Sequence, residues 1–299
     1  MNSTSPVEQI TFIGLGMMGY PMAGRLASSG YPLNAFDLKS DTLERFVNEF
    51  SGVTYSSAIE ASKDTNIVIT MLPSSDEVYA TLLGLDESQG VVSVLKPGSI
   101  VIDMSSSDPV RTRKLADILD KYWITLVDAP VSGGLKKAQE GNLSIMFGGD
   151  RESLKRCRKI LEKLGSAIFH TGSVGTGHAM KALNNYISAA GLVAVVEALH
   201  AGEKFGLDPK IMTAILNAST GKNNTTENKV LQYMLSGDFN SGFSLQLMVK
   251  DLGLAVQLAD DLDVSAPLAH TCLAIWRKAA DAQQDNIIDH TEMYRLMDG

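Results

Sequence analysis

Near its start the chain carries the stretch Ile10-Thr-Phe-Ile-Gly14-Leu-Gly16-Met-Met-Gly19, in which a short apolar strand runs directly into three glycines. The glycine spacing is G-x-G-x-x-G, and residues 20–28 then have the pattern of a helix. Such glycines permit a tight turn and a close backbone approach, so that a pyrophosphate can lie against the helix N-terminus. The glycines alone are weak evidence, because ordinary turns also contain them, but the strand before and the helix after predict a dinucleotide-binding unit.

A second strand, residues 32–36, ends at Asp37, which lies 23 residues after Gly14. The dinucleotide fingerprint places an acidic residue at about this distance, where it binds the ribose 2′-hydroxyl. A carboxylate there repels a 2′-phosphate and favours NAD over NADP, although Lys39 partly offsets this repulsion. The predicted NAD-binding residues of this first segment are Gly14, Leu15, Gly16, Met17, Met18, Gly19 and Asp37.

Three further apolar strands, residues 67–72, 99–103 and 124–127, each run into a loop of small, polar or Pro/Gly residues. Parallel strands end on one edge of a doubly wound sheet, which is the edge where such sheets bind ligands. Turn chemistry alone accounts for each loop separately, but three such loops on one edge favour a binding site. In the last of them, Ser132-Gly133-Gly134 offers a hydroxyl and consecutive backbone N–H groups for a carboxylate.

From Gly175 onward the pattern is helical. Residues 182–199 are almost entirely apolar, and a helix that is apolar on all sides is buried, so we expect a central helix over residues 178–205. Lys181 and Asn185 share one face near its start. A lysine on a buried helix must find a partner, reach water or lose its charge, which favours a catalytic role. The plain alternative is a lysine that extends to the surface.

The other helices expected in this half cover residues 208–217, 227–235, 245–262, 267–284 and 289–296, and a polar loop is expected over residues 219–226. The loop is interpreted as solvated. The chain therefore divides into a dinucleotide-binding domain, residues 1–173, and an all-helical domain, residues 174–299, joined by the long helix.

Composition excludes several classes of function. A net charge of −8 without a basic stripe argues against nucleic-acid binding. The two Asn residues and Glu197 in the apolar helix argue against a membrane span. The two cysteines, Cys157 and Cys272, are expected to be reduced thiols, and no His or Cys spacing indicates a metal site. The N-terminal residues do not resemble a signal peptide, so a cytoplasmic protein is expected.

Taken together, the motifs resemble the β-hydroxyacid dehydrogenase family, which includes 3-hydroxyisobutyrate dehydrogenase. The segments that carry this resemblance are Gly14–Gly19, Met71-Leu-Pro73, Asp128-Ala-Pro-Val-Ser-Gly-Gly134, Gly175-Thr-Gly177 with Lys181 and Asn184-Asn185, and Phe243 with Lys250-Asp251-Leu252. They occur in the family's order across almost the whole chain.

The resemblance implies a Rossmann-type domain followed by an all-α domain, and it implies that Lys181 is the catalytic acid/base. Substrate-binding positions implied by it are Ser132, Gly133, Gly134, Asn184 and Asn185. Leu72, Pro73 and Ser106 are implied to lie beside the nicotinamide, Glu77 to contact the cofactor and Lys250 to lie near the cofactor ribose. Relatives often have an aromatic residue where this chain has Asn224, which points to a substrate with a more polar tail.

We therefore expect NAD-dependent oxidation of the primary alcohol of a small 3-hydroxy acid to the semialdehyde, in a homodimer or homotetramer. The alternatives are an NADPH-preferring reductase of tartronate semialdehyde or glyoxylate type, an imine reductase, and a non-catalytic NAD-binding protein. Asp37 speaks against NADPH, and Lys181 speaks against an imine reductase, because the relatives of that type lack this lysine.

Overall fold

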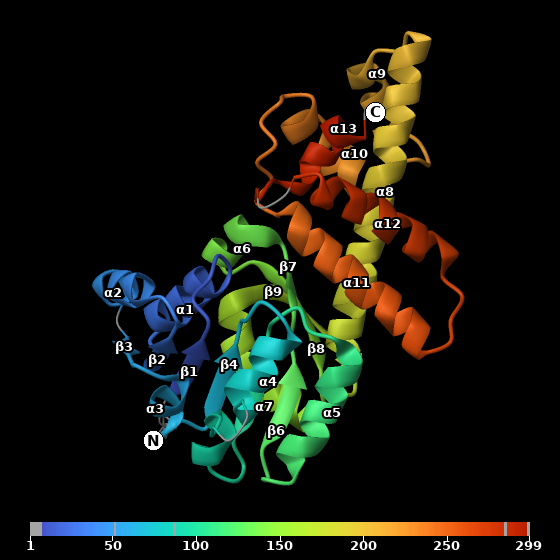
Figure 1. Cartoon of the computed structure of the whole chain (residues 1–299). Helices are drawn as coiled ribbons and strands as arrows, with labels where there is room; N and C mark the ends of the chain where they lie inside the picture. The colour runs from blue at the N-terminus through green and yellow to red at the C-terminus, as the bar shows by residue number, and fades with distance from the viewer. Residues whose placement is uncertain (1–7, 51, 86–87, 284–285, 298–299) are drawn as a thin grey trace. The chain divides into compact units, whose positions relative to one another are not determined.

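The computed structural model describes residues 8–50, 52–85, 88–283 and 286–297 (Figure 1). The N-terminal residues 1–7, on which the expectation of a cytoplasmic protein rests, lie outside the described residues, as does residue 284 at the end of one expected helix. The chain forms two compact units, Met1–Lys181 and Ala182–Gly299, which meet within one long helix.

The N-terminal unit is built on a sheet with nine strands in the described part of the chain. The strand order is β3-β2-β1-β4-β5-β6-β8-β7, with β9 paired to β8. The parallel strands are β1 (Ile10–Ile13), β2 (Leu33–Phe36), β3 (Val53–Thr54), β4 (Ile67–Thr70), β5 (Ile100–Asp103) and β6 (Thr125–Asp128). The sheet continues with β7 (Val131–Ser132), β8 (Leu143–Gly148) and β9 (Gly165–Gly172), of which β8 runs antiparallel to β6 and β7. The order 3-2-1-4-5-6 is that of dinucleotide-binding sheets, which confirms the predicted Rossmann-type fold.

Helices cover both faces of this sheet (Figure 1). They are α1 (Gly19–Ser28), α2 (Ser40–Glu49), α3 (Ala58–Ser62), α4 (Ser75–Leu83), the 3₁₀ turn η1 (Val91–Val94), α5 (Pro109–Asp120), α6 (Gly134–Glu140) and α7 (Arg151–Leu164). Side chains alternate along a strand, so Ile67 and Ile69 of β4 pack in the core formed with α1 and α7, whereas Val68 packs with α4 and α5. Burial on both faces explains the continuous apolar runs in the sequence.

The C-terminal unit is helical. Its elements are the larger part of α8 (Thr176–Phe205), α9 (Pro209–Asn217), α10 (Asn224–Asn228), the π-helical turn η2 (Val230–Met234), α11 (Leu245–Asp261), α12 (Pro267–Asp281), the 3₁₀ turn η3 (His290–Glu292) and α13 (Met293–Leu296). By length and composition α8 could cross a membrane. In this unit, however, its side chains Leu192, Val196 and Leu199 pack in a core around Trp276.

The polar run expected to be a loop contains a helix start. The Asn223 side chain accepts hydrogen bonds from the backbone N–H groups of Thr225 and Thr226, and the Thr226 hydroxyl accepts one from Asn223, which forms a capping box. The helix expected over residues 227–235 is wrong in detail, because α10 ends at Asn228 and a π turn follows. Strand β7 and helix α6 were not anticipated, because the sequence there reads as a glycine turn.

Both cysteines are buried and free. Burial raises the pKa of the Cys157 thiol to about 12 and that of the Cys272 thiol to about 11. A thiol with so high a pKa is a poor nucleophile at neutral pH, so both cysteines are packing residues here.

The packing of the sheet core can be tested at Phe147 of β8, whose ring is 0% exposed. Phe169 of the neighbouring β9 is 58% exposed. Replacing Phe147 with Ala removes a fully buried ring and is expected to lower the free energy of unfolding of the N-terminal unit by about 3–5 kcal/mol. Phe169→Ala is the control and should change it by no more than about 0.5 kcal/mol. Urea unfolding followed by circular dichroism measures both, and equal losses would contradict this packing.

Candidate active site

The glycine turn after β1 is closely packed against backbone at Gly14 and Gly19 and open at Gly16. Gly14 has φ 97°, and a Cβ there would collide with the carbonyl oxygen of Met71 after β4. A Cβ at Gly19 would collide with the carbonyl oxygen of Gly14, whereas a Cβ at Gly16 would meet no atom within 4 Å. Gly14 and Gly19 therefore allow α1 to start against the sheet, and Gly16 leaves space for a ligand. This is the shape that a pyrophosphate requires at a helix N-terminus.

Asp37 lies directly after β2, beside this turn. Its Oδ2 accepts a hydrogen bond of 2.7 Å from the Leu15 backbone N–H, and its Oδ1 accepts one of 2.9 Å from that of Lys39. A hollow of about 700 Å³ runs past it. The lining residues are Leu15, Gly16, Met17, Tyr20, Pro21, Gly24, Arg25, Ser28, Asp37, Lys39, Thr42, Arg45, Glu49, Phe50, Leu135 and Gln139. The carboxylate at the rim and the open glycine turn fit NAD.

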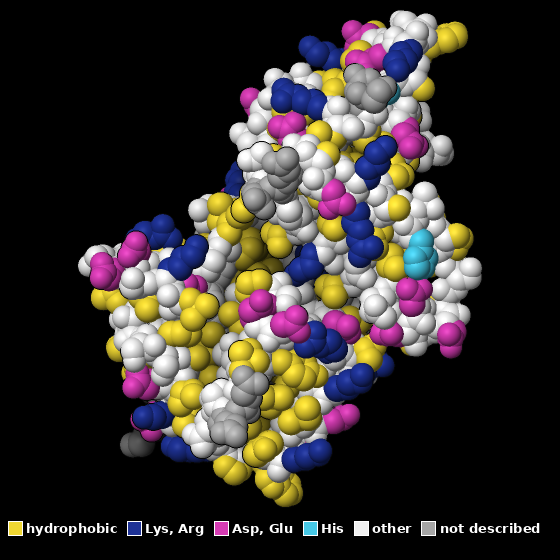
Figure 2. Space-filling view, viewed as in Figure 1, with side chains coloured by type: hydrophobic (Ala, Val, Ile, Leu, Met, Phe, Trp, Pro, Cys, Tyr) yellow, Lys and Arg dark blue, Asp and Glu magenta, His cyan; other side chains and the backbone are white. Residues whose placement is uncertain are grey.

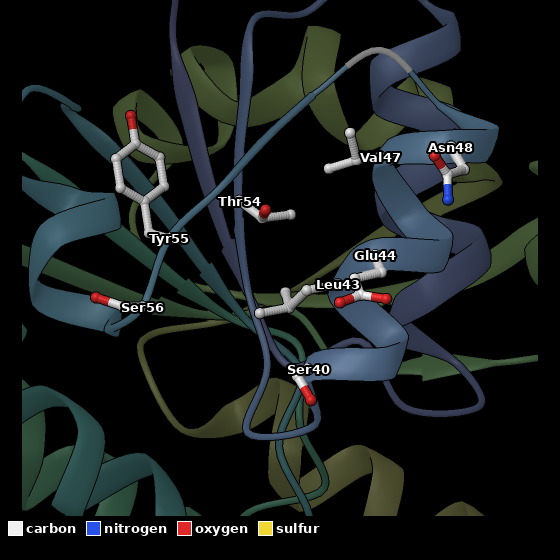
Figure 3. Close-up of a pocket in the computed structure, with 8 residues that line it drawn as sticks. All are labelled: Ser40, Leu43, Glu44, Val47, Asn48, Thr54, Tyr55 and Ser56. Carbon is white, nitrogen blue, oxygen red and sulfur yellow. The ribbon is translucent and has the colours of Figure 1, made fainter.

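A second hollow, of about 580 Å³, lies between α2 and the segment around β3 (Figure 3). It is lined by Ser40, Leu43, Glu44, Val47, Asn48, Thr54, Tyr55 and Ser56, with Leu43, Val47 and Thr54 around the space. None of these residues is a predicted site residue. On the surface in Figure 2, basic and acidic side chains are interspersed.

The three predicted strand ends lie side by side. Thr70 is the register partner of Asp103, and Asp103 is the partner of Asp128, so β4, β5 and β6 end at one level. The buried Asp103 carboxylate accepts hydrogen bonds from the hydroxyls of Thr70, at 2.9 Å, and Ser107, at 2.8 Å. The Ser105 hydroxyl accepts one from the Leu72 backbone N–H at 2.9 Å. Hydrogen bonds between side chains and loops therefore fix this edge of the sheet.

The carboxylate of Asp128 ties this edge to α8. Its Oδ1 accepts a hydrogen bond of 2.6 Å from the Gly175 backbone N–H, and its Oδ2 accepts one of 2.8 Å from that of His178. These are N–H groups that a helix start leaves without a partner, and an acceptor with negative charge stabilises them. Burial raises the pKa of Asp128 above its ordinary value, while the nearby His178 and the two N–H donors oppose the shift.

The His178 ring is fully buried among polar groups. Its Nδ1 lies 2.8 Å from the Thr112 hydroxyl, its Nε2 lies 3.7 Å from Asp103 Oδ2, and its Nδ1 lies 3.9 Å from Asp128 Oδ2. The ring therefore packs the first turn of α8 against the ends of β5 and β6. The part that His178 plays at this helix start is therefore structural.

Lys181 is half-buried and follows His178 by three residues on α8, so the anchored first turn sets its position. Asn185, one turn further, is only 7% exposed. Its Oδ1 accepts a hydrogen bond of 3.0 Å from Asn184, and its Nδ2 donates one of 2.5 Å to Asp251. Asp251 also lies 3.5 Å from the Lys250 ammonium. Asp251 was not predicted as a site residue, although it directly follows Lys250 in a segment that carries the family resemblance.

The remaining predicted residues occupy different places. Ser132 ends β7, and Gly133 and Gly134, with φ of 138° and 70°, open α6. Leu72 and Pro73 follow β4, and Ser106 follows β5, on the edge that also carries the glycine turn. Glu77 is exposed in the first turn of α4, where it accepts a hydrogen bond of 2.6 Å from Ser74, and Asn224 is exposed at the start of α10.

The described residues contain no group of three or more His, Cys, Asp or Glu side chains that could hold a metal ion. The polar cluster at the strand ends is instead built from carboxylates, hydroxyls and one imidazole. Its groups bond to one another and to the start of α8.

The chain is similar to known proteins over nearly its whole length. The family profile described as the NAD binding domain of 6-phosphogluconate dehydrogenase matches residues 9–172. The profile described as NAD-binding of NADP-dependent 3-hydroxyisobutyrate dehydrogenase matches residues 175–297. The NAD-dependent L-serine dehydrogenase of Pseudomonas aeruginosa is 35% identical over 277 residues, which cover 91% of this chain and 92% of that protein.

Two further relatives match over most of their length. The 2-(hydroxymethyl)glutarate dehydrogenase of Eubacterium barkeri is 36% identical over 260 residues, covering 87% of this chain and 85% of that protein. The structure of Mycobacterium tuberculosis 3-hydroxyisobutyrate dehydrogenase with L-serine superposes with a TM-score of 0.88 at 30% identity, covering 98% of this chain and 100% of that chain.

The fold and the sequence matches together define an NAD(P)-dependent oxidoreductase that acts on CH–OH donors. More narrowly, the chain belongs to the β-hydroxyacid dehydrogenase family, with the 3-hydroxyisobutyrate dehydrogenases and their relatives. The predicted family, fold class and NAD cofactor are thereby confirmed.

Asp37 is expected to set the preference for NAD. In Asp37→Asn the charge that repels a 2′-phosphate is lost, and so is a charged acceptor for the 2′-hydroxyl, which is worth about 1.5–3 kcal/mol. The ratio of kcat/KM with NAD to kcat/KM with NADP should fall at least about tenfold. Initial rates with both cofactors measure it. Asp41→Asn, which neutralises an exposed carboxylate in the first turn of α2, is the control, and an equal change in both variants would contradict the role of Asp37.

Proposed function

We propose that this protein oxidises the primary alcohol of a small 3-hydroxy acid to the semialdehyde, with NAD as oxidant and Lys181 as general acid/base. The observation that carries the proposal is the anchored start of α8. Two hydrogen bonds to Asp128 and the buried ring of His178 fix the turn before Lys181. A catalytic group on a rigid helix keeps the orientation that proton transfer needs.

Oxidation of the alcohol removes a hydride from carbon and a proton from oxygen. NAD, when bound, supplies the hydride acceptor. The Lys181 amine takes the hydroxyl proton as the C–O bond gains double-bond character, and in the reverse direction its ammonium returns the proton to the aldehyde oxygen. A correctly placed acid/base group of this kind contributes roughly 10²–10⁴ in rate.

The predicted substrate-binding residues have the chemistry to hold such a substrate. In the N-terminal unit, the Ser132 hydroxyl and the backbone N–H groups of Gly133 and Gly134 can donate to its carboxylate. In the C-terminal unit, Asn185 donates one amide hydrogen to Asp251 and accepts a bond from Asn184. Its second amide hydrogen can then bind a substrate oxygen. Asp251 therefore acts as a positioning residue for Asn185.

The relatives' substrates share one chemical unit. Serine, 3-hydroxyisobutyrate and 2-(hydroxymethyl)glutarate all contain a CH₂OH group on the carbon that bears the carboxylate. They differ in the third substituent on that carbon, which is an amino, methyl or carboxyethyl group. This common unit supports a 3-hydroxy acid as the substrate class and leaves the tail to be decided by this chain's own residues.

We further propose a cytoplasmic homodimer or homotetramer. The support for assembly is the apolar surface of the C-terminal unit, where Ile187 of α8 is 66% exposed and Ile211 and Ile215 of α9 are about as exposed. Exposed apolar side chains on neighbouring turns mark interaction surfaces. Light scattering of the purified protein should give the mass of two or four chains, and a monomer at micromolar concentration would contradict the proposal.

Lys181→Ala tests the catalytic assignment. Turnover with the preferred hydroxy acid should fall by about 10²–10⁴ while NAD binding is retained, because the variant removes the proton acceptor and leaves the glycine turn intact. Steady-state rates and calorimetry with NAD measure the two effects. Lys204→Ala, which removes an exposed lysine in the last turn of the same helix, is the control. Retained turnover in Lys181→Ala would exclude this mechanism.

A further inference from the structure

A buried ammonium group in the C-terminal unit has no part in the proton transfer described above. Lys229 connects α10 to the π turn η2 and is only 8% exposed. Among the described residues its Nζ donates a hydrogen bond of 3.3 Å to the Ser188 hydroxyl. An ammonium has three donors, and burying a charge is costly unless it is paired.

The acidic group whose charge acts on Lys229, Asp289, already has hydrogen-bond donors of its own. Asp289 accepts hydrogen bonds from the hydroxyls of Ser241 and Thr291 and from the Gly242 backbone N–H. Within the described part of the chain, none of the ion pairs includes Lys229. Burial lowers the pKa of Lys229 to about 8, although the charge of Asp289 opposes the shift. The ammonium would therefore gain stability from an anion that reaches it.

The backbone around Lys229 is irregular and well fixed. Its carbonyl oxygen accepts hydrogen bonds from both Tyr233 N, at 3.0 Å, and Met234 N, at 3.2 Å, and the second of these bonds opens the π turn. Single π turns interrupt helices frequently at functional sites. The two bonds fix the backbone of Lys229, whose Nζ reaches Ser188.

The bond to Ser188 relates the Lys229 ammonium to Lys181, the proposed acid/base, because Ser188 and Lys181 lie on the same helix. It follows Asn185 by three residues and Lys181 by seven on the continuous helix α8, so all three share one face. At a rise of 1.5 Å per residue, Ser188 is about 4.5 Å along the helix from Asn185 and about 10.5 Å from Lys181. The polar face that begins at Lys181 therefore ends at Ser188, where the Lys229 ammonium is bonded.

We propose that Lys229 and Ser188 bind a second carboxylate at the end of the substrate's tail, so that the substrate is a hydroxy dicarboxylic acid. The inference rests on the proposed function and names its substrate class. The Ser188 hydroxyl accepts a hydrogen bond from Lys229 and can donate its own hydrogen to the tail carboxylate. Lys229 has two further N–H donors for the same group, and such charge-assisted bonds are strong in a buried site. This assigns the polar tail to Lys229 and Ser188, whereas the sequence pointed to the exposed Asn224.

The test compares two substrates that differ only in the tail. With NAD, initial rates are measured for 3-hydroxyisobutyrate, which has a methyl tail, and 2-(hydroxymethyl)glutarate, which has a carboxyethyl tail. The wild type should prefer the dicarboxylate. In Lys229→Met, an uncharged side chain of similar length, KM for the dicarboxylate should rise about 100-fold, because the tail carboxylate then loses its charged partner in a buried site. Its kcat, and both parameters for the methyl-tailed acid, should change less than about threefold.

Lys222→Met is the matched control, because it removes an exposed lysine that pairs with Glu227 in the same region, and it should leave both substrates unchanged. Equal losses for the two tails in Lys229→Met would overturn the proposal and indicate a structural lysine. A wild type that oxidises the methyl-tailed acid without preferring the dicarboxylate would also overturn it while leaving the proposed function intact.

Two measurements keep the proposal testable if Lys229→Met does not fold or if neither acid is oxidised. In the wild type, the ratio of kcat/KM for the dicarboxylate to that for the methyl-tailed acid should fall as pH rises through about 8, since the ammonium is then lost. Any titration of Lys181 cancels in this ratio, and Asp289 and His290, the other titratable groups near Lys229, titrate at lower pH.

If neither acid is oxidised, the proposed function fails, and calorimetry with glutarate then tests the carboxylate site by itself. If the wild type binds glutarate, and binding weakens at least tenfold in Lys229→Met or above pH 8, the proposed carboxylate site is supported. If the wild type does not bind glutarate, the proposed site is rejected.

Discussion

The carboxylate of Asp128 is the contact on which the candidate active site depends. It ends β6, and its two oxygens accept hydrogen bonds from the backbone of Gly175 and His178, so the last residue of a strand becomes the acceptor for the first turn of α8. Burying this carboxylate is unfavourable, as the raised pKa of Asp128 indicates. The interaction offsets that cost by satisfying N–H groups that a buried helix start would otherwise leave unpaired.

The glycine turn after β1 and the loops after β4 and β5 lie at the same edge of the sheet, and they are fixed in different ways. The glycine turn after β1 depends on the absence of side chains, since a Cβ at Gly14 or Gly19 would collide with backbone. The loops after β4 and β5 depend on polar side chains. The Ser105 hydroxyl accepts a hydrogen bond from the Leu72 backbone, and the Asp103 carboxylate accepts hydrogen bonds from the hydroxyls of Thr70 and Ser107. A cofactor-binding surface thus lies beside a hydrogen-bonded cluster that keeps the neighbouring loops in place, as preorganised sites require.

Much of this arrangement is predictable from the sequence, because it follows from local patterns. The strand before Gly14, the acidic residue at Asp37 and the apolar run of α8 are each read over short windows, and the parallel order then brings the strand ends together. What the sequence did not reveal is pairing over long separations. Asp251 bonds Asn185, and Lys229 bonds Ser188, and neither pair has a periodic signal. The capping box of Asn223 was missed for a different reason, because a run of Asn and Thr is equally typical of a loop.

The π turn after Lys229 also has a consequence for how this enzyme could diverge. A π turn contains one residue more than an α-helical turn, so deleting a single residue within Val230–Met234 would shorten the turn after Lys229 and rotate Lys229 by about 100° relative to the residues that follow. Lys229 would then leave Ser188, while the glycine turn, Asp128 and Lys181 would be untouched. If Lys229 binds the substrate tail as proposed, a one-codon deletion would alter which hydroxy acids are accepted without changing the residues assigned to hydride transfer, so that substrate range and chemistry could change separately.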